Sequence, residues 1–285
     1  MNAVAQIYPA PAKLNLFLHV VGRRADGYHL LQTAFRFIDY GDDLTFTVRA
    51  DGAIRRITAL PGVEEAQDLS VRAARLLQKE TGCASGADIG IVKRLPMGGG
   101  LGGGSSDAAT TLIALNRLWK TGVSRERLQQ LGLTLGADVP VFVFGQSAFA
   151  EGVGERLQAL RLPPAWYLVL VPELAVSTAE IFSAAELTRN TNAITIAPFS
   201  VGLARNIPGR NDLEPVVCGR YPQVARHLEW LRQFGDARMT GSGACVFCAF
   251  SNEEAARRAL SELPSGMRGF VARGLDRHPL WSEDE

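Results

Sequence analysis

The apolar residues of the chain follow two spacings, which together predict a mixture of strands and helices. Continuous or alternating apolar runs predict strands at residues 14–21, 44–49, 87–93, 166–171, 244–250 and 268–274. Apolar residues that recur every three or four positions predict helices at residues 68–80, 105–119, 124–132, 177–186, 222–234 and 252–262. Ser124 is expected to be the N-cap of the third helix. Residues 141–144 and 147–150 are short apolar segments, and residues 189–210, rich in Asn, Thr and Pro, are expected to be irregular.

The pattern changes near residues 155–165, where Pro163 and Pro164 interrupt it. A chain of 285 residues is near the size at which a single core stops growing, so one large or two modest domains are expected. We place the boundary here, with an N-terminal domain over residues 1–158 and a C-terminal domain over residues 159–285. The sequence contains no internal repeat.

Composition excludes several classes of protein. Hydrophobic residues make up 47% and charged residues 21% of the chain, as in ordinary globular proteins, and the net charge is +1. Because no long basic run appears, no nucleic acid or membrane partner is expected. The protein is expected to be a monomer or a weak homodimer. Lys13, Asn15 and His19 interrupt the apolar N-terminus, which argues against a signal peptide, and no run is long enough to span a membrane.

The four cysteines are too few for a disulfide framework in a chain of this length. Cys245 and Cys248 form a C-x-x-C pair, but zinc normally needs a second pair, and Cys83 and Cys218 are not adjacent. We therefore interpret Cys245 and Cys248 as buried apolar residues. Together with the absence of a signal peptide or membrane span, this predicts a cytoplasmic protein.

The glycine loop, residues 98–104, is the most informative segment. It holds six glycines and Leu101, follows a predicted strand, and leads through Ser105 and Ser106 into a helix. Glycines let backbone N–H groups approach an anion closely, and a helix start adds free N–H groups and partial positive charge. The loop is therefore expected to bind a polyphosphate, with possible help from the two serine hydroxyls.

Two other motifs fit this loop less well, and one simpler interpretation stays open. A P-loop requires Gly-Lys-Ser/Thr at the helix start, whereas Ser105 follows Gly104 directly. A dinucleotide fingerprint requires a second strand with an acidic end, whereas residues 121–131 are predicted to be helical. The remaining alternative is a flexible loop without a ligand.

Asp107, in the first helical turn, could contribute to Mg²⁺ binding or simply pair with the helix dipole.

The segment PMGGGLGGGSSDAA resembles the phosphate loop of the GHMP kinases, the superfamily of galactokinase, homoserine kinase, mevalonate kinase and phosphomevalonate kinase. Gly103 and Gly104 lengthen the loop, as in the branch that acts on 4-diphosphocytidyl-2-C-methyl-D-erythritol. The resemblance continues in PAKLNLFLHV, RADGYHLLQT, GADVPVFVFG, AFAEGVGE and MTGSGACVF, so it covers nearly the whole chain.

This resemblance implies an α+β, two-domain GHMP kinase fold. Its N-terminal α/β domain would be like one found in a ribosomal protein, its C-terminal α/β domain would be ferredoxin-like, and the active site would lie in the cleft between them. The implied reaction is ATP-dependent phosphorylation of the 2-hydroxyl of 4-diphosphocytidyl-2-C-methyl-D-erythritol, giving the 2-phosphate and ADP in the non-mevalonate (methylerythritol phosphate) isoprenoid pathway. ATP would be the co-substrate and Mg²⁺ the cofactor.

Asp138 and Lys13 are the candidate catalytic residues. Asp138 lies between Ala137 and Val139, so its carboxylate is expected to be partly buried and to need a partner. Taken alone, it could be a helix cap or a structural ion pair, and Lys13 could extend to the surface. The resemblance implies instead that Asp138 is the catalytic aspartate, with Lys13 beside it keeping the carboxylate ionised and neutralising developing charge.

The resemblance also implies the binding residues. ATP would contact Asp68, Lys93, Pro96, Met97, Gly98, Gly99, Gly100, Leu101, Gly102, Gly103, Gly104, Ser105 and Ser106. The family often has Asn at the position of Asp68, which is a departure. A substrate with a cytidine diphosphate group would contact Asn15, Tyr28, His29, Thr178 and Phe182, with Tyr28 and Phe182 stacking on the cytosine. Asp212 is expected to be structural, and residues 239–244, the second glycine turn, would back the glycine loop.

Two alternative functions remain. Another GHMP kinase, acting on homoserine or mevalonate, would share the loop, but the extra glycines and the Tyr28-His29 pair favour the first function. A non-catalytic nucleotide-binding or RNA-binding module would share part of the fold. The presence of Lys13, Asp138 and the complete loop argues against it, as does the lack of a basic patch.

Overall fold

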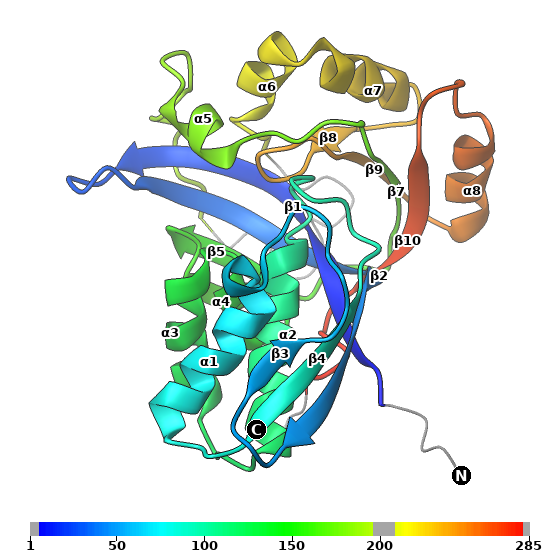
Figure 1. The fold of residues 1–285 in the computed structure, drawn as a ribbon. Helices are drawn as coiled ribbons and strands as arrows, with labels where there is room; N and C mark the ends of the chain where they lie inside the picture. Colours follow the sequence, from blue (N-terminus) through cyan, green and yellow to red (C-terminus); the bar gives the residue numbers. More distant parts are fainter. Residues whose placement is uncertain (1–5, 196–208, 282–285) are drawn as a thin grey trace.

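The computed structural model describes residues 6–195 and 209–281, which form an α+β fold with helices packed around a single ten-stranded sheet (Figure 1). The main path of the sheet is β3-β4-β2-β10-β7-β9-β8, while β1 and β5 also pair with β2, and β6 pairs with β5. The strands are β1 (Tyr8–Arg23), β2 (His29–Arg49), β3 (Ile54–Arg56), β4 (Gly86–Val92), β5 (Ala148–Gly152), β6 (Arg156–Ala159), β7 (Trp166–Leu170), β8 (Arg238–Met239), β9 (Val246–Phe250) and β10 (Gly269–Leu275).

The long antiparallel hairpin of β1 and β2 carries several predicted site residues. Lys13 pairs with Phe37 and Asn15 with Phe35, and register shifts at Pro11/Ala12 and between Asn15 and Leu18 flank these two polar residues. Such irregularities redirect side chains locally, which lets Lys13 and Asn15 leave the apolar face. Figure 1 shows the far end of this hairpin projecting from the body of the molecule near helix α5 (Thr178–Ser183).

Two groups of helices cover the sheet around separate apolar cores. One core lies beneath α1 (Leu69–Thr81), α2 (Gly103–Leu118), α3 (Arg125–Leu135) and α4 (Val139–Phe144). The other lies beneath α5, α6 (Glu214–Arg220), α7 (Pro222–Arg232) and α8 (Glu253–Ser261). A third apolar cluster, which includes Leu14, Leu101 and Val169, connects the two parts and packs directly beneath the glycine loop. A short 3-10 helix, Glu65–Gln67, precedes α1.

The end of the described chain returns to the N-terminal helices. Strand β10 pairs with β7 and also with β2, where Gly274 faces Ile38. Beyond it, the Leu280 carbonyl accepts a hydrogen bond from Arg117 Nη2 on α2 at 2.5 Å. Residues from the C-terminal segment therefore complete the packing of the N-terminal part.

The structure confirms the α+β class and every predicted strand and helix, with shifted ends. Helix α2 begins two residues before Ser105, at Gly103, and α5 ends at Ser183 rather than at residue 186. Ser124 caps α3 as predicted, because its side chain accepts a bond from the Arg127 amide. Residues 189–195 are irregular as predicted, and residues 196–208 of that segment lie outside the described residues. Elements absent from the prediction include β3, β6, β8 and α6.

Candidate active site

A cleft of about 560 Å³ lies between the two parts, and the glycine loop forms one of its walls. It gathers most of the predicted site residues: Lys13, Asn15, Asp68, Lys93, residues 96–105, Asp107, Asp138, Thr178 and Phe182. Leu213, Gly241 and Ser242 line it from the C-terminal part. Tyr28, His29 and Ser106 are not among the residues that line this cleft.

Two glycines in the loop have no substitute. Gly100 has φ +75°, and a Cβ there would lie 2.2 Å from the Thr240 carbonyl oxygen in the second glycine turn. Gly102 has φ +76°, and a Cβ there would meet the Phe142 ring at 3.0 Å. The left-handed backbone and the close packing both require glycine. The glycine loop is therefore held from behind by the second glycine turn, as the resemblance implied.

The first turn of α2 offers unpaired amides to the cleft. Gly102 is its N-cap and provides no side-chain cap, while the Ser106 amide donates to the Gly102 carbonyl at 2.8 Å. The amides of Gly103, Gly104 and Ser105 precede this first helical bond and are the ones that a helix start leaves free. With the helix dipole, they form a positive environment suited to phosphate oxygens.

Ser106 does not contribute a hydroxyl to this cradle, which corrects the expectation that both serines do. Its side chain is fully buried, and its Oγ donates to the Pro11 carbonyl at 2.7 Å. The bond joins α2 to β1, so Ser106 fixes the strand that carries Lys13. Leu101 is also buried, at 1% exposure, and its backbone rather than its side chain holds this strand, since its carbonyl accepts the Lys13 amide at 3.0 Å.

Lys13 and Asp138 form an ion pair beside the glycine loop. Lys13 Nζ lies 3.3 Å from Asp138 Oδ2, and the lysine is 2% exposed whereas the aspartate side chain is 35% exposed. Asp138 is the N-cap residue of α4, yet its side chain makes no capping bond. Its carboxylate is thus free of the helix, open to the cleft and paired with a buried cation.

The ammonium of Lys13 also contacts the loop and the acceptor side of the cleft. It donates to the Gly100 carbonyl at 2.9 Å and to Asn15 Oδ1 at 2.5 Å, and lies 5.6 Å from the centre of the Phe35 ring. Together with the ion pair to Asp138, the two hydrogen bonds give each of the three N–H groups of this buried ammonium a partner, without which it would be costly to desolvate.

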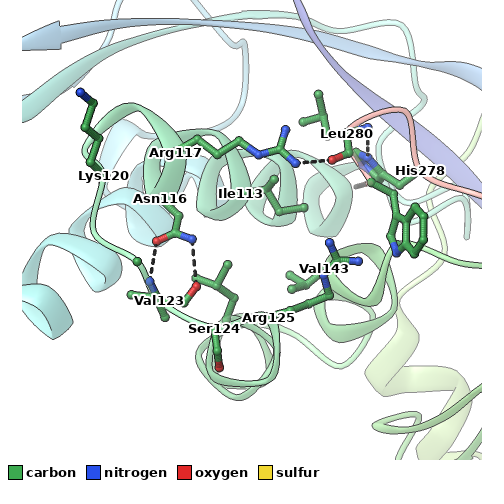
Figure 2. Close-up of a pocket in the computed structure, with 14 residues that line it drawn as sticks. Ile113, Asn116, Arg117, Lys120, Val123, Ser124, Arg125, Val143, His278 and Leu280 are labelled. Atoms are coloured by element: carbon green, nitrogen blue, oxygen red, sulfur yellow. Dashed lines mark hydrogen bonds between the residues drawn. The ribbon is translucent and has the colours of Figure 1, made fainter. Parts of the chain in front are cut away.

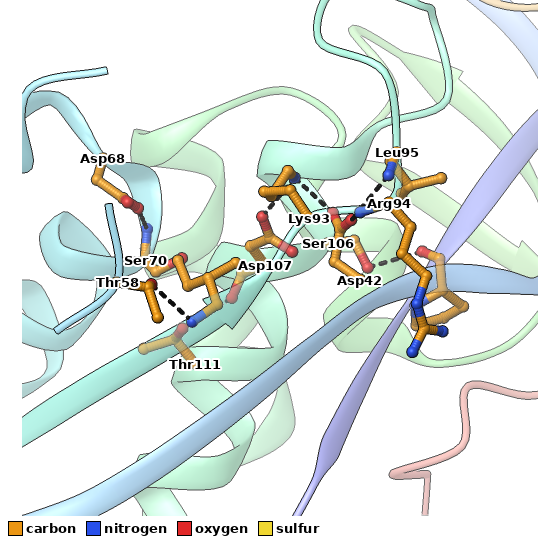
Figure 3. Close-up of polar contacts among 12 residues, drawn as sticks. Asp42, Thr58, Asp68, Ser70, Lys93, Arg94, Leu95, Ser106, Asp107 and Thr111 are labelled. Carbon is orange, nitrogen blue, oxygen red and sulfur yellow. Dashed lines mark hydrogen bonds and ion pairs between the residues drawn. The ribbon is translucent and has the colours of Figure 1, made fainter. Parts of the chain in front are cut away.

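Lys93 lies between two buried carboxylates beneath the loop (Figure 3). Its Nζ donates to Asp42 and, at 2.8 Å, to Asp107 Oδ2. Asp42 is fully buried, and its Oδ1 also accepts the amides of Arg94 at 2.6 Å and Leu95 at 2.9 Å. Asp42 therefore fixes the chain as it enters the loop. We did not expect this role, because Gly41-Asp42-Asp43 reads as an ordinary turn in the sequence.

The local charges favour a cation near Asp107. Burial raises the pKa of Asp107 to about 7, although the charge of Lys93 acts in the opposite direction. Its Oδ1 is buried without a hydrogen-bond partner and its residue lines the cleft, so one carboxylate oxygen remains for a further ligand. In the described part of the chain, no group of three or more His, Cys, Asp or Glu residues could enclose a metal. The residues present thus fit Mg²⁺ held mainly by nucleotide phosphates, with one protein carboxylate beside it.

Asp68 is already engaged by the protein. Its Oδ1 accepts the Ser70 amide at 2.8 Å as the N-cap of α1, and its Oδ2 pairs with Arg56 at 2.9 Å. Although Asp68 lines the cleft, both carboxylate oxygens have partners. The side chain therefore helps to shape the wall of the cleft, and the expected direct ATP contact receives no support from its geometry.

Several polar residues that were expected to bind the substrate also line the cleft. The Asn15 side chain donates through Nδ2 to Thr33 Oγ1 at 2.9 Å, and its backbone N–H donates to Thr240 Oγ1 at 2.9 Å. Thr178 Oγ1 and Ser242 Oγ lie 2.7 Å apart and connect α5 with the second glycine turn. Asn15, Thr33, Thr178 and Ser242 line the same cleft as Asp138 and offer it hydrogen-bonding groups.

Further out, the structure brings His29 rather than Tyr28 against Phe182. The ring centroids of His29 and Phe182 are 5.1 Å apart with an interplanar angle of 33°. Tyr28 is 65% exposed in the adjacent hairpin turn. Arg189 Nε donates to His29 Nε2 at 3.1 Å, a contact that we did not expect because Arg189 lies in a segment without a periodic pattern.

Asn211 anchors the second glycine turn. Its Nδ2 donates to the carbonyls of Met239 and Gly241, both at 2.8 Å. Asp212 accepts the Val20 amide at 2.8 Å, which agrees with the structural role expected for it. Cys245 and Cys248 are each 1% exposed and belong to different apolar clusters, which confirms that they are buried residues.

A second cavity, of about 430 Å³, lies away from these residues between α2, α3 and the C-terminal segment (Figure 2). Its walls include Ile113, Val143 and Trp281, with Arg117 near the rim. None of the predicted site residues lines it. The chemistry expected from the sequence therefore belongs to the cleft with the glycine loop. Among the described residues, no helix has the length and apolar character to cross a membrane.

Comparison with known proteins identifies the family. Two family profiles match, "GHMP kinases N terminal domain" over residues 68–146 and "GHMP kinases C terminal" over residues 196–269. A 4-diphosphocytidyl-2-C-methyl-D-erythritol kinase of Thiobacillus denitrificans is 66% identical over 278 residues, covering 98% of each chain. The enzyme of the same name from Nitrosospira multiformis is 66% identical over 275 residues, covering 95% of this chain and 92% of the relative.

Solved structures agree with this assignment. A crystal structure of 4-(cytidine 5'-diphospho)-2C-methyl-D-erythritol kinase matches with a TM-score of 0.82 and 35% identity, covering 94% of this chain and 99% of the other. The mevalonate kinase of Methanococcus jannaschii matches with a TM-score of 0.66 and 17% identity, covering 96% of this chain and 100% of the other, which shows a shared fold. The chain therefore belongs to the 4-diphosphocytidyl-2-C-methyl-D-erythritol kinase family of the GHMP kinases.

Proposed function

We propose that this chain transfers the γ-phosphate of ATP to the 2-hydroxyl of 4-diphosphocytidyl-2-C-methyl-D-erythritol, giving the 2-phosphate and ADP. The observation that carries the proposal is the contact of 3.3 Å between buried Lys13 and cleft-facing Asp138, beside a glycine loop whose residues line the same cleft. Phosphoryl transfer to an alcohol requires these parts in one place: a phosphate cradle, a base for the hydroxyl and positive charge nearby. The step would belong to the non-mevalonate isoprenoid pathway.

The glycine loop and the first turn of α2 would bind the triphosphate. The free amides of Gly103, Gly104 and Ser105 point into an environment made positive by the helix dipole. Lys93 supports the loop from below through Asp42 and Asp107, so its role would be to position the loop rather than to contact ATP directly. Pro96 and Met97 would line the entrance on the adenosine side.

Asp138 would accept the proton of the acceptor hydroxyl as the new oxygen–phosphorus bond forms. Lys13 would pair with this carboxylate before the transfer and reduce the negative charge around the moving phosphoryl group. Because Lys13 also donates to the Gly100 carbonyl, it would align the base with the phosphate cradle. A positioned base of this kind typically contributes about 10² to 10⁴-fold to the rate.

Mg²⁺ would be held by the phosphates and by Asp107, whose Oδ1 has no protein partner. When bound, the metal would neutralise phosphate charge and fix the orientation of the terminal phosphate. The glycine loop would bind ATP from one side of the metal, and the space beside Asp138 would stay open for the acceptor hydroxyl.

The cytidine diphosphate group would extend toward the hairpin end and α5. Phe182 and Tyr28 would stack on the cytosine, His29 would bond to its polar edge, and Asn15 and Thr178 would contact the methylerythritol and diphosphate. Homoserine and mevalonate kinases share the fold at 14–17% identity, which supports no choice of acceptor. We also keep a cytoplasmic location and a monomer or weak homodimer as parts of this proposal.

Coupled ADP release tests the function directly. We expect turnover with ATP, Mg²⁺ and 4-diphosphocytidyl-2-C-methyl-D-erythritol, and background rates with homoserine, with mevalonate or when EDTA removes the metal. The Asp138→Asn variant, which keeps the shape of the side chain, is the matched control. Turnover of homoserine or mevalonate at a rate equal to that of the cytidine substrate would contradict the proposal.

A further inference from the structure

His29 contacts two residues from α5 and the segment that follows it. Phe182 packs against the ring at a centroid distance of 5.1 Å, and Arg189 Nε donates to its Nε2 at 3.1 Å. The histidine begins β2 at the tip of the hairpin, whereas Phe182 and Arg189 come from α5 and the segment after it. The contact thus connects parts of the chain that are 160 residues apart in sequence.

Arg189 is itself fixed by the end of helix α5. Its Nη1 donates to the Leu187 carbonyl at 3.0 Å, and its Nη2 donates to the carbonyls of Ala184 at 2.6 Å and Phe182 at 3.2 Å. Carbonyls at a helix C-terminus are free to accept such bonds and carry partial negative charge. The guanidinium therefore presents its Nε–H to His29 from a rigid, backbone-anchored position.

This contact determines which nitrogen of His29 carries the proton. A guanidinium has only donors, so His29 Nε2 must keep its lone pair and the neutral ring must carry its hydrogen on Nδ1. Burial lowers the pKa of His29, and the charges of Arg189 and of Arg23 on the hairpin lower it further, so the ring is neutral at pH 7 and above. No hydrogen bond joins Nδ1 to any acceptor in the described part of the chain, which leaves this N–H for a ligand.

We propose that Arg189 is a specificity-determining residue that positions His29 as an Nδ1–H donor and so selects a pyrimidine with an acceptor at ring position 3. Cytosine presents a lone pair at N3, whereas uracil presents an N–H there and would place two donors against each other. The inference rests on the proposed function for the presence of a cytidine group near His29. The tautomer of His29 follows from the protein alone.

The first experiment reads the tautomer without any substrate. The chain has four histidines, so long-range ¹H–¹⁵N spectra are simple, and His29→Gln assigns the signal of His29. We expect the wild-type ring to be neutral with its hydrogen on Nδ1 between pH 7 and 8. In Arg189→Met, we expect a mixture of tautomers and a higher pKa, because a donor and a nearby positive charge are lost.

The second experiment measures the choice of base. The ratio of kcat/KM between the cytidine substrate and its uridine analogue should fall about tenfold in Arg189→Met, the value of one oriented hydrogen bond. Arg220→Met is the matched control, because Arg220 pairs with Glu180 and Glu186 beside the same helix but does not touch His29. We expect this control to keep the wild-type ratio and the wild-type spectrum of His29.

The outcomes separate the two proposals. A wild-type His29 that is charged, or that carries its hydrogen on Nε2 at pH 7.5, overturns the role of Arg189 even if the Arg189→Met variant does not fold. An altered tautomer with an unchanged cytidine-to-uridine ratio overturns the specificity role. Failure of the wild-type protein to use the cytidine substrate contradicts the proposed function instead, and the spectrum of the free protein still decides the tautomer.

Discussion

The Asp107→Asn substitution removes one of the two carboxylates that share the single ammonium of Lys93. In the wild type, Asp107 is 4% exposed, and one of its oxygens has no partner. The variant keeps the size of the side chain and its ability to accept a hydrogen bond from Lys93. It leaves a balanced pair of Lys93 and Asp42 in place of a buried cluster with one negative charge in excess.

The expected change in stability follows from the pKa of this group. Burial raises the pKa of Asp107 from 3.8 to about 7, so the folded state binds the proton more tightly than the unfolded state does. Ionisation therefore costs stability as the pH rises from near the unfolded pKa to the folded pKa, and the full cost is present above it. Between pH 5 and pH 8, the wild type should lose on the order of 2 to 3 kcal/mol through this group, whereas the asparagine variant should lose none of it.

Urea unfolding at pH 5, 6, 7 and 8, with EDTA and without nucleotide, measures this difference. The difference in free energy of unfolding between Asp107→Asn and the wild type should increase toward pH 8 in favour of the variant. Asp43→Asn controls for the loss of a single acidic group, because Asp43 lies next to Asp42 but pairs with Arg94 at the surface. If the Asp107→Asn difference changes by less than about 0.5 kcal/mol across this range, the carboxylate is not destabilised by its site and the reasoning is wrong.

Three further predictions concern the cleft. Asp138→Asn should lower kcat about 10² to 10⁴-fold with little change in the KM for ATP. Lys13→Met should lower kcat and also raise the KM for ATP, because Lys13 contacts the Gly100 carbonyl of the glycine loop; equal KM values for ATP in the two variants would contradict this role of Lys13. Gly100→Ala should lower the free energy of unfolding by at least about 2 kcal/mol, since its Cβ would lie 2.2 Å from a carbonyl oxygen. Gly104→Ala, whose Cβ would have its nearest neighbour at 3.4 Å, should lose far less stability when the two variants are compared by thermal unfolding. Asn211→Ala should destabilise the protein by about 2 to 3 kcal/mol and raise the KM for ATP, because two carbonyls in the second glycine turn lose their donor; a loss of stability without an effect on KM would separate this turn from the loop.

Local sequence patterns predicted the elements that carry the site, because each has a strong signal of its own. The glycine run predicts a loop, and the alanine-rich stretch from Ser105 predicts a helix, which in the structure already begins at Gly103. Lys13 stands out because it interrupts an apolar strand, and the structure places its ammonium 3.3 Å from Asp138. A charged residue in an apolar run thus pointed correctly to a partner far away in the sequence.

The residues that sequence analysis missed act through tertiary contacts. Asp42 looks like a turn residue, yet it is fully buried and accepts hydrogen bonds from Lys93 and from the amides of Arg94 and Leu95, just before the glycine loop. Arg189 lies in an irregular segment, and only the folded hairpin brings His29 to it. The error at Ser106 has the same origin, because helical spacing turns this hydroxyl away from the cleft and toward the Pro11 carbonyl. Partners of this kind depend on how strands and helices pack, which no local pattern encodes.

Lys13 explains why the phosphate cradle and the base cannot be considered separately. An ammonium that is 2% exposed persists only where each of its N–H groups has a partner, and here these partners are the Gly100 carbonyl, Asn15 and Asp138. They come from the glycine loop, the acceptor side of the cleft and the start of α4. A displacement of the loop must therefore move the ammonium, and with it the positive charge that pairs with Asp138. With Asp138 as the proposed base, such a shared cation would align it with the bound nucleotide before an acceptor arrives, which is the pre-organisation that phosphoryl transfer requires.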